Sequence, residues 1–294
     1  MQLSTKNRKL FFKLHSNLLN YAHTDGNAKR ILSLAEFNEK FDIKQKDKMR
    51  KKLYAKPFFL DKFIKENPLS FNKKELKIIK SWKNFLKGEF VMLRQLKNYA
   101  IFLDFKKPRH AYGVLALNNL FEEILPWYPI IIEAVLLPFK NKIIYDGIFY
   151  TQQISFGPGT RRNFNDSYQE AKARFGIITS LPFSEKKFKK KPAELLKAYL
   201  KIKSAREYHW DKIIKMISRD KNLRVLFHQE MGKIDARSYR KRLHEIKIKP
   251  GWFAILNGLL IAGSDDKNNL ESIIAKIVPK EKKDYVYKFK LNEY

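Results

Sequence analysis

Four apolar segments near the middle of the chain decide the fold: NYAIFLDF (98–105), AYGVLAL (111–117), PIIIEAVLLPF (129–139) and KIIYDGIFYTQQISF (142–156). They are rich in Ile, Val, Tyr and Phe, and each apolar run is short and bounded by turn residues. This pattern is typical of β-strands rather than of helices. Together with EFVMLRQL (89–96) they predict five or six mainly antiparallel strands, which form a curled sheet or a small open barrel.

The connections between these segments predict two hairpins. A turn at Lys97-Asn98 joins the first two strands, and the stretch FKNK (139–142) joins the last two. Between the hairpins, LFEEIL (120–125) predicts a short helix that the following proline ends. The central region is therefore expected to hold few helices.

Residues 1–88 predict helices, because their apolar residues recur at intervals of three and four. The clearest helix follows Asn72, which forms a capping-box pattern with Glu75 three residues later. Gly88 is expected to end this helix. Its buried stripe is expected to consist of Leu76, Ile79, Trp82, Phe85 and Leu86.

Residues after Pro182 predict a basic and mainly helical region. A long helical region is expected from Ala193 to about Ser218, whereas LRVLFHQEM (223–231) fits a helix and a strand equally. The alternation of apolar and charged residues in KKDYVYKFKLNEY (282–294) predicts an edge strand. The chain is therefore expected to be an α+β protein with three parts: a helical region 1–88, a central strand-rich domain 89–182, and a basic, mainly helical region 183–294.

The balance of charge narrows the possible partners. The 294 residues include 61 Lys and Arg against 30 Asp and Glu, which gives a net charge of +31. Residues 101–150 hold five of each sign, whereas residues 1–100 hold 24 basic against 9 acidic, and residues 151–250 hold 25 against 10. A polyanion would relieve this self-repulsion, so we expect nucleic acid, a ribonucleoprotein or an anionic membrane surface as the partner.

Composition also excludes several classes of protein. The 44% hydrophobic and 14% aromatic content excludes a disordered tail, and the absence of cysteine excludes disulfides, thiolate nucleophiles and Cys-ligated zinc. Lys13, His15 and Asn17 interrupt the amino-terminal apolar segment, which predicts an amphipathic helix rather than a signal peptide. The apolar stretch 113–139 contains no run of about 18 apolar residues. We therefore expect a soluble, cytoplasmic protein.

The motif FGPGTRRNF (156–164) is a candidate for anion binding. Its glycines allow successive backbone amides to converge, and a helix is expected to begin just beyond it, at Asn165 or Asp166, and to end at Gly176. Arg161 and Arg162 could supply bidentate contacts to a phosphate. The motif is neither a Walker loop nor a dinucleotide fingerprint, and an exposed turn with solvated arginines is the alternative interpretation.

Two basic clusters are further candidates for phosphate contacts. On a helix, Arg237, Arg240 and Lys241 would share one face, a geometry that can follow a phosphate backbone, and Arg242 is adjacent. The other cluster lies in SEKKFKKKP (184–192). It comprises Lys186, Lys187, Lys189, Lys190 and Lys191. A solvated charged surface is the alternative interpretation of both clusters.

Asp104, Glu133 and Asp146 are the candidate catalytic carboxylates, because each lies within or beside a predicted strand of the neutral core. Carboxylates from neighbouring strands could hold Mg²⁺ for phosphodiester cleavage. Capping of a turn, or pairing with a nearby lysine, is the alternative for each. The sequence contains neither an HExxH nor a GxSxG motif, so whether the protein is an enzyme stays open.

These features predict a nucleic-acid-binding protein that recognises the phosphate backbone without strong sequence specificity. RNA or a ribonucleoprotein is favoured, because the chain contains no recognisable zinc finger, basic zipper or single recognition helix. The alternative is a metal-dependent nuclease or phosphotransfer enzyme of a toxin or defence system. Only that alternative requires Mg²⁺, and no other cofactor is expected. An acidic protein partner is a third possibility.

Overall fold

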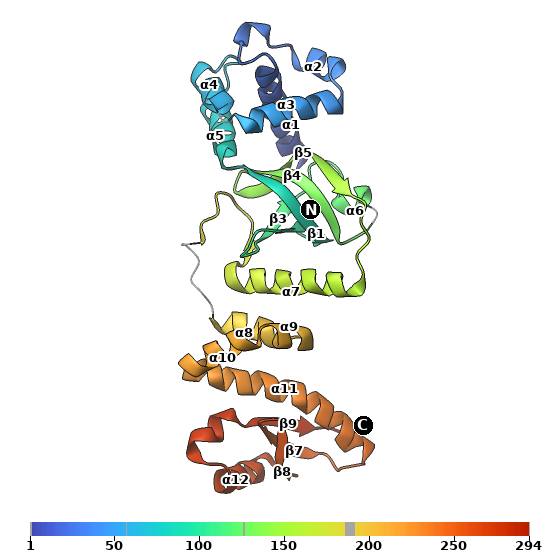
Figure 1. Cartoon of the computed structure of the whole chain (residues 1–294), viewed down its shortest axis with the longest axis vertical. Helices are drawn as coiled ribbons and strands as arrows, with labels where there is room; N and C mark the ends of the chain where they lie inside the picture. Colours follow the sequence, from blue (N-terminus) through green and yellow to red (C-terminus); the bar gives the residue numbers. More distant parts are fainter. Residues whose placement is uncertain (1, 57, 126, 186–191, 294) are drawn as a thin grey trace. The chain divides into compact units, whose positions relative to one another are not determined.

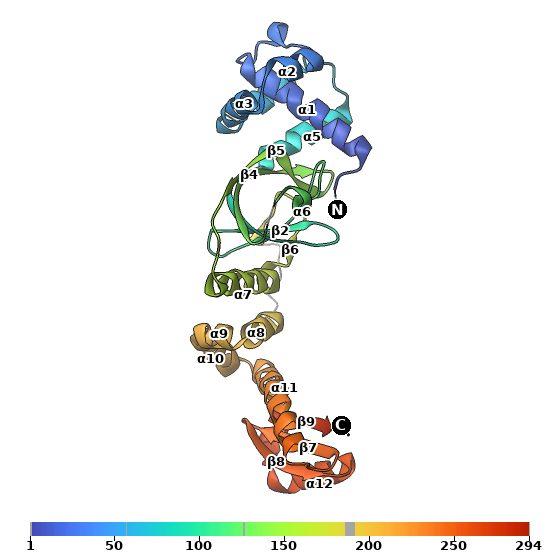
Figure 2. The same ribbon diagram turned by 90° about the vertical axis from the view of Figure 1, so that its right-hand side faces the viewer.

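A computed structural model describes residues 2–56, 58–125, 127–185 and 192–293 (Figures 1 and 2). The chain divides into two compact units, Met1–Phe188 and Lys189–Tyr294, and each unit contains both helices and a sheet. The predicted α+β class is confirmed. Within the described residues, no helix combines the length and the apolar character needed to cross a bilayer.

The first unit opens with helices, as the sequence predicts. α1 buries Phe11, Leu14 and Leu18 along one face, and α2 begins at a capping box formed by Ser33 and Glu36. The elements of this region are α1 (Thr5–His23), η1 (Ala28–Arg30), α2 (Leu34–Lys40), α3 (Ile43–Ala55), α4 (Phe58–Glu66), α5 (Lys73–Ser81) and η2 (Trp82–Asn84).

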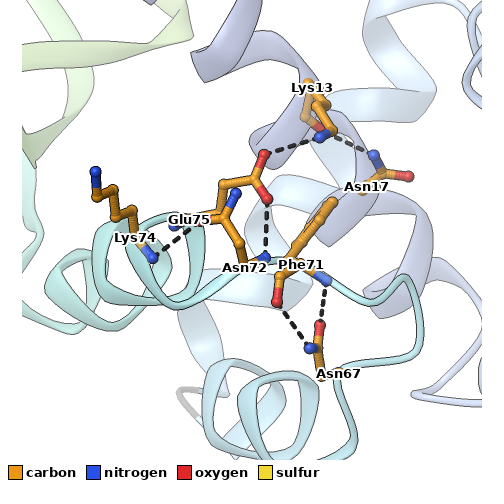
Figure 3. Close-up of polar contacts among 7 residues, drawn as sticks. All are labelled: Lys13, Asn17, Asn67, Phe71, Asn72, Lys74 and Glu75. Atoms are coloured by element: carbon orange, nitrogen blue, oxygen red, sulfur yellow. Dashed lines mark hydrogen bonds and ion pairs between the residues drawn. The ribbon is translucent and has the colours of Figure 1, made fainter.

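The amino-terminal cap of α5 connects this helix to α1 (Figure 3). The Asn72 side chain accepts hydrogen bonds from the backbone amides of Lys74 and Glu75, and the Glu75 carboxylate accepts one from the Asn72 amide at 3.0 Å. The predicted capping box is therefore confirmed. Glu75 also pairs with Lys13 of α1 at 2.8 Å, and the Lys13 ammonium lies over the Phe71 ring.

The predicted end of this helix was wrong. α5 ends at Ser81 rather than at Gly88, and Phe85 already has an extended backbone. Gly88 lies within a strand, where it pairs with Ala134. Pairing with β4 (Ile130–Phe139) satisfies the backbone hydrogen-bonding groups of the chain around Gly88. This long-range interaction outweighs the helix-like spacing of the apolar residues that precede it.

The central strands form a closed ring. β1 pairs with β2 and β4, β3 pairs with β2 and β5, and β4 pairs with β5. All these pairs are antiparallel except β3–β5, and the two predicted hairpins, β1–β2 and β4–β5, are confirmed. The strands are β1 (Leu86–Gln95), β2 (Ala100–Asp104), β3 (Ala111–Leu115), β4 (Ile130–Phe139) and β5 (Lys142–Gln152), and a short β6 (Ile177–Ile178) adds parallel to β3.

This connectivity, with a helix between β3 and β4, is that of an OB-fold barrel. The helix, α6 (Phe121–Ile124), buries Phe121 completely. The Phe121 ring lies 5.3 Å from the rings of both Phe102 and Tyr145. These contacts place it against residues of the barrel core. That core is continuous with the core of the amino-terminal helices.

The outer surface of β1, β2 and β3 is also apolar, and it lies beneath α7 (Pro158–Phe175). Successive residues of a strand point to opposite sides of the sheet. Phe90 therefore belongs to the core shared with the helices, whereas the adjacent Val91 packs with α7. The buried residues of this second core are Val91, Leu93, Ile101, Leu103, Ala111, Phe164, Tyr168 and Ala171.

The second unit contains a three-stranded antiparallel sheet of order β8-β7-β9 with helices on both faces. A Cβ atom added to Gly232 of α11 would lie 2.2 Å from Tyr287 Cβ, so this helix approaches β9 closely. β9 lies at an edge of the sheet, as predicted. The elements are α8 (Pro192–Leu200), α9 (Lys203–Tyr208), α10 (Trp210–Arg219), α11 (Lys221–Glu245), β7 (Gly251–Leu256), β8 (Leu259–Ser264), α12 (Lys267–Ile277), η4 (Lys280–Tyr285) and β9 (Tyr287–Leu291).

The helices of this unit test two predictions from the sequence. The helical region predicted from Ala193 to about Ser218 is confirmed and consists of three helices, α8, α9 and α10, with the break between α9 and α10 at His209. The His209 ring packs 4.1 Å from that of Tyr199 in α8. The ambiguous segment 223–231 is helical and belongs to α11.

The capping box of α5 provides a test of local stability. We expect Asn72→Ala to lower the free energy of unfolding by about 1 kcal/mol, because two backbone amides lose their acceptor. Urea unfolding of the full chain measures the effect. Lys74→Ala is the matched control, since it lies on the same helix and only its backbone takes part in the cap. Equal stability of the two variants would contradict the role of Asn72.

His15 links stability to pH. It is 3% exposed, its Nε2 lies 3.0 Å from Tyr54 Oη, and the Phe11 ring stacks on it. Burial, aided by the charge of Arg50, lowers the pKa of His15 from 6.5 to about 3. Below pH 6.5 the unfolded chain gains a proton that the folded protein excludes. The contribution of neutral His15 is therefore complete above pH 6.5 and is lost progressively as the pH falls toward 3.

We expect the free energy of unfolding to decrease more steeply between pH 6.5 and about 4 in the natural protein than in His15→Gln, by up to about 1.4 kcal/mol per pH unit. Urea unfolding at a series of pH values measures the difference between the slopes. His23→Gln, which changes an exposed histidine, should keep the natural slope. Parallel pH profiles for the natural protein and His15→Gln would refute this role of the buried ring.

Candidate nucleic-acid interface

The FGPG motif opens α7 directly. Gly157 is the N-cap and Pro158 the first helical residue, which is a favoured position for proline. The prediction that this helix begins at Asn165 or Asp166 was therefore wrong, whereas its predicted end at Gly176, with φ of 70°, is confirmed. From Pro158 onward the motif is part of the helix rather than a loop before it.

Both predicted arginines lie in the first turns of α7 and are exposed. Arg161 Nε donates a hydrogen bond to the Phe156 carbonyl at 2.8 Å, which holds its guanidinium beside the start of the helix. Arg162 is two residues before the buried Phe164, and at 100° per residue this spacing directs it away from the barrel. The positive end of the helix dipole adds to the charge of both side chains.

The β2–β3 loop packs beside this end of α7. The Phe105 and Phe164 rings lie 6.5 Å apart, and the Arg109 guanidinium lies 5.6 Å from the first ring and 6.0 Å from the second. Phe164 also contacts Phe156 at 5.2 Å, the residue that holds Arg161. A continuous series of contacts therefore joins the loop to the start of the helix.

We call this surface the α7 rim and define it as Phe105, Lys106, Lys107, Arg109 and Arg161. Both lysines and Arg161 are exposed, and the Phe105 side chain is 39% exposed. Among the described residues, Arg109 Nη1 is buried without a hydrogen-bond partner. Sequence analysis missed Phe105 and Arg109. The signal that could have identified them is the alternation of an aromatic residue and cations in FKKPRH (105–110).

The barrel surface that most often binds ligands in OB-folds is closed in this chain. That surface covers strands β2 and β3, and here Ile101, Leu103 and Ala111 are buried beneath α7. The outer faces of β2 and β3 are therefore covered, whereas the two lysines and Arg161 of the rim are exposed. The rim is the part of this region where cations and an exposed ring occur together.

The basic residues of α11 have different roles. Arg237, Lys241 and Arg242 are exposed, and Lys241 makes only a loose pair with Glu245 at 3.8 Å. Arg240 instead donates to the Lys290 carbonyl at 3.2 Å and stacks over an aromatic ring of β9. The predicted face thus has exposed cations at Arg237 and Lys241, while Arg240 holds the helix against the sheet. The predicted cluster Lys186, Lys187, Lys189, Lys190 and Lys191 lies outside the described residues.

Asp104 has local partners at the end of β2. Its carboxylate accepts hydrogen bonds from the His110 backbone amide at 2.8 Å and from Tyr112 Oη at 3.4 Å, and it lies 3.2 Å from His110 Nδ1. His110 Nε2 in turn lies 3.0 Å from Glu185. The arrangement fixes the ends of the β2–β3 loop, which carries the rim.

Asp146 and Glu133 have other partners. Asp146 forms a buried ion pair with Arg50 of α3, and burial raises the pKa of Asp146 to about 6, although the charge of Arg50 opposes the rise. Glu133 lies on β4 opposite Glu89 and Tyr150. Across the described residues, no group of three His, Asp or Glu side chains is arranged to hold a metal ion. The hypothesis of a metal-dependent nuclease therefore has no ligand cluster in that part of the chain.

Comparison of the chain with protein-family models, curated proteins and solved structures finds no match. The strand pairings alone give the barrel its OB-fold connectivity.

Proposed function

We propose that the protein binds single-stranded nucleic acid, with RNA as the favoured polymer, through the phosphate backbone and without strong sequence preference. The observation that carries the proposal is the α7 rim, where an exposed aromatic ring, Phe105, lies among cations. Proteins that bind single strands combine a cationic surface along the backbone with aromatic rings on which bases stack. The rim offers both components.

Charge supports the same conclusion. The net charge of +31 is far above what solubility requires, and Lys106, Lys107 and Arg161 of the rim have no ion-pair partner among the described residues. Cations without carboxylate partners can release counterions from a phosphate backbone, which favours binding of any sequence. This argument gives affinity for the backbone and predicts little discrimination between bases.

The exposed cations of α11 are a second candidate surface for the same polymer. Arg237 and Lys241 are four residues apart, so they lie on one side of the helix, and Arg242 is adjacent. Two separate cationic surfaces on one chain would increase the apparent affinity for a long strand without any new contact, provided that the strand reaches both.

We expect binding of a mixed-sequence single-stranded RNA to weaken steeply with salt. If the four cations of the rim each neutralise one phosphate, the plot of log affinity against log salt should have a slope of about −3 or steeper. Fluorescence anisotropy at several salt concentrations measures this slope. An affinity that does not change between low and physiological salt would refute backbone recognition.

We expect Phe105→Ala to weaken RNA binding by about tenfold, because one base loses its stacking surface. Arg109→Gln should make the slope of log affinity against log salt shallower by about 1, because one phosphate contact is lost. The matched control for the ring is Phe58→Ala, which removes another exposed phenylalanine of the same unit and should leave affinity unchanged. Thermal unfolding of each variant verifies that the fold is retained. If Phe105→Ala and Phe58→Ala bind RNA equally well, the rim is not the interface.

A further inference from the structure

The amino-terminal helices contain a pocket of about 450 Å³ that is separate from the α7 rim. It forms where α1 ends and the chain returns through η1 to α2. This volume lies within the range of small-molecule sites. The residues that line it include His23, Asp25, Asn27, Arg30, Leu32 and Lys40.

Hydrogen bonds hold the loop of this pocket in place. Asp25 and Gly26 have φ of 55° and 77°, so the chain reverses direction directly after α1. The fully buried Asn20 donates to the Leu32 carbonyl at 2.8 Å and accepts from the Leu32 amide at 3.4 Å. Lys62 Nζ donates to the Gly26 carbonyl at 2.9 Å. These bonds hold the backbone of the loop in place before any ligand binds, which reduces the backbone entropy lost on binding.

The charges around the pocket are unbalanced. Asp25 is the one carboxylate in its wall, and it pairs with Lys52 at 2.6 Å. The hydrogen bond and the charge of Lys52 lower the pKa of Asp25, so it stays ionised and its charge is already matched. Arg30 forms no ion pair with a described residue, whereas the Lys40 ammonium lies 5.7 Å over the Phe41 ring and its charge also acts on Glu36, one turn earlier in α2. The pocket therefore has positive charge available for an anion.

We propose that this pocket binds a phosphate monoester of mononucleotide size. Arg30 can donate two parallel hydrogen bonds to the phosphate, and Lys40 adds a point charge. The His23 ring, which packs 4.7 Å from the ring of Phe41, and Leu32 supply the less polar wall against which the rest of the ligand lies. The proposal does not depend on RNA binding at the rim, because the two sites share no residue.

Isothermal titration calorimetry of the full chain with AMP, adenosine and inorganic phosphate tests the site. We expect AMP to bind, phosphate to bind more weakly and adenosine not to bind. Arg30→Gln should weaken AMP binding about tenfold or more, the effect of losing a charge-assisted hydrogen bond. Lys29→Gln is the matched control, since it removes the same charge from the adjacent exposed residue that does not line the pocket, and it should bind AMP like the natural protein. Lys40→Gln is the second variant and should weaken AMP binding in the same direction.

Three results would overturn the proposal. They are absence of AMP binding at millimolar concentration, equal binding of AMP and adenosine, and equal loss of affinity in Arg30→Gln and Lys29→Gln. A pair of oligoribonucleotides with a 5′-phosphate or a 5′-hydroxyl end distinguishes the sources of the ligand. Tighter binding of the phosphorylated end, lost in Arg30→Gln, assigns the pocket to RNA ends. Equal binding of the two oligonucleotides, with AMP binding that still depends on Arg30, assigns it to free nucleotides. Failure of the RNA-binding proposal would leave the AMP result unaffected.

Discussion

The first unit depends on one buried cation. Arg50 of α3 is 2% exposed and donates hydrogen bonds to Asp47 of its own helix and to Asp146 of β5. A guanidinium without these partners could not remain in an apolar core, and removal of one member of such a buried pair typically costs 3–5 kcal/mol. The pairing therefore fixes the amino-terminal helices against the barrel. The hydrophobic core is continuous across the same boundary, so the helices and the barrel form one compact unit rather than two.

A second constraint is the apolar outer surface of the barrel. Val91, Ile101 and Leu103 point away from the barrel core and would be exposed if α7 did not cover them. Packing of α7 removes this surface from water and also closes the strand face that OB-folds most often use for ligands. The same packing places Phe164 against Phe105. A single helix thus stabilises the barrel and positions the cations of the rim. The candidate interface therefore lies at the edge of α7 and not on the strand face that OB-folds most often use.

The local parts of this fold could be predicted from the sequence. The β1–β2 and β4–β5 hairpins, the capping box of Asn72 and the end of α7 at Gly176 follow from turn residues, caps and the alternation of apolar side chains within one segment. The errors occur where distant contacts determine the local structure. α5 ends at Ser81 rather than at Gly88, because the chain from Leu86 onward pairs with β4.

The sequence by itself determined the excess of positive charge, the strand-rich centre and the candidate arginines Arg161 and Arg162. Only the tertiary structure decided what each charged residue does. In the folded chain Asp146 is buried against Arg50, Arg240 donates a hydrogen bond to β9, and the loop that contains Phe105 lies beside α7. The physical reason is that the charge of a segment and the spacing of its apolar residues can be read from that segment alone. The burial of a side chain and its pairing with another depend on residues that are far apart in the chain and meet only when it folds.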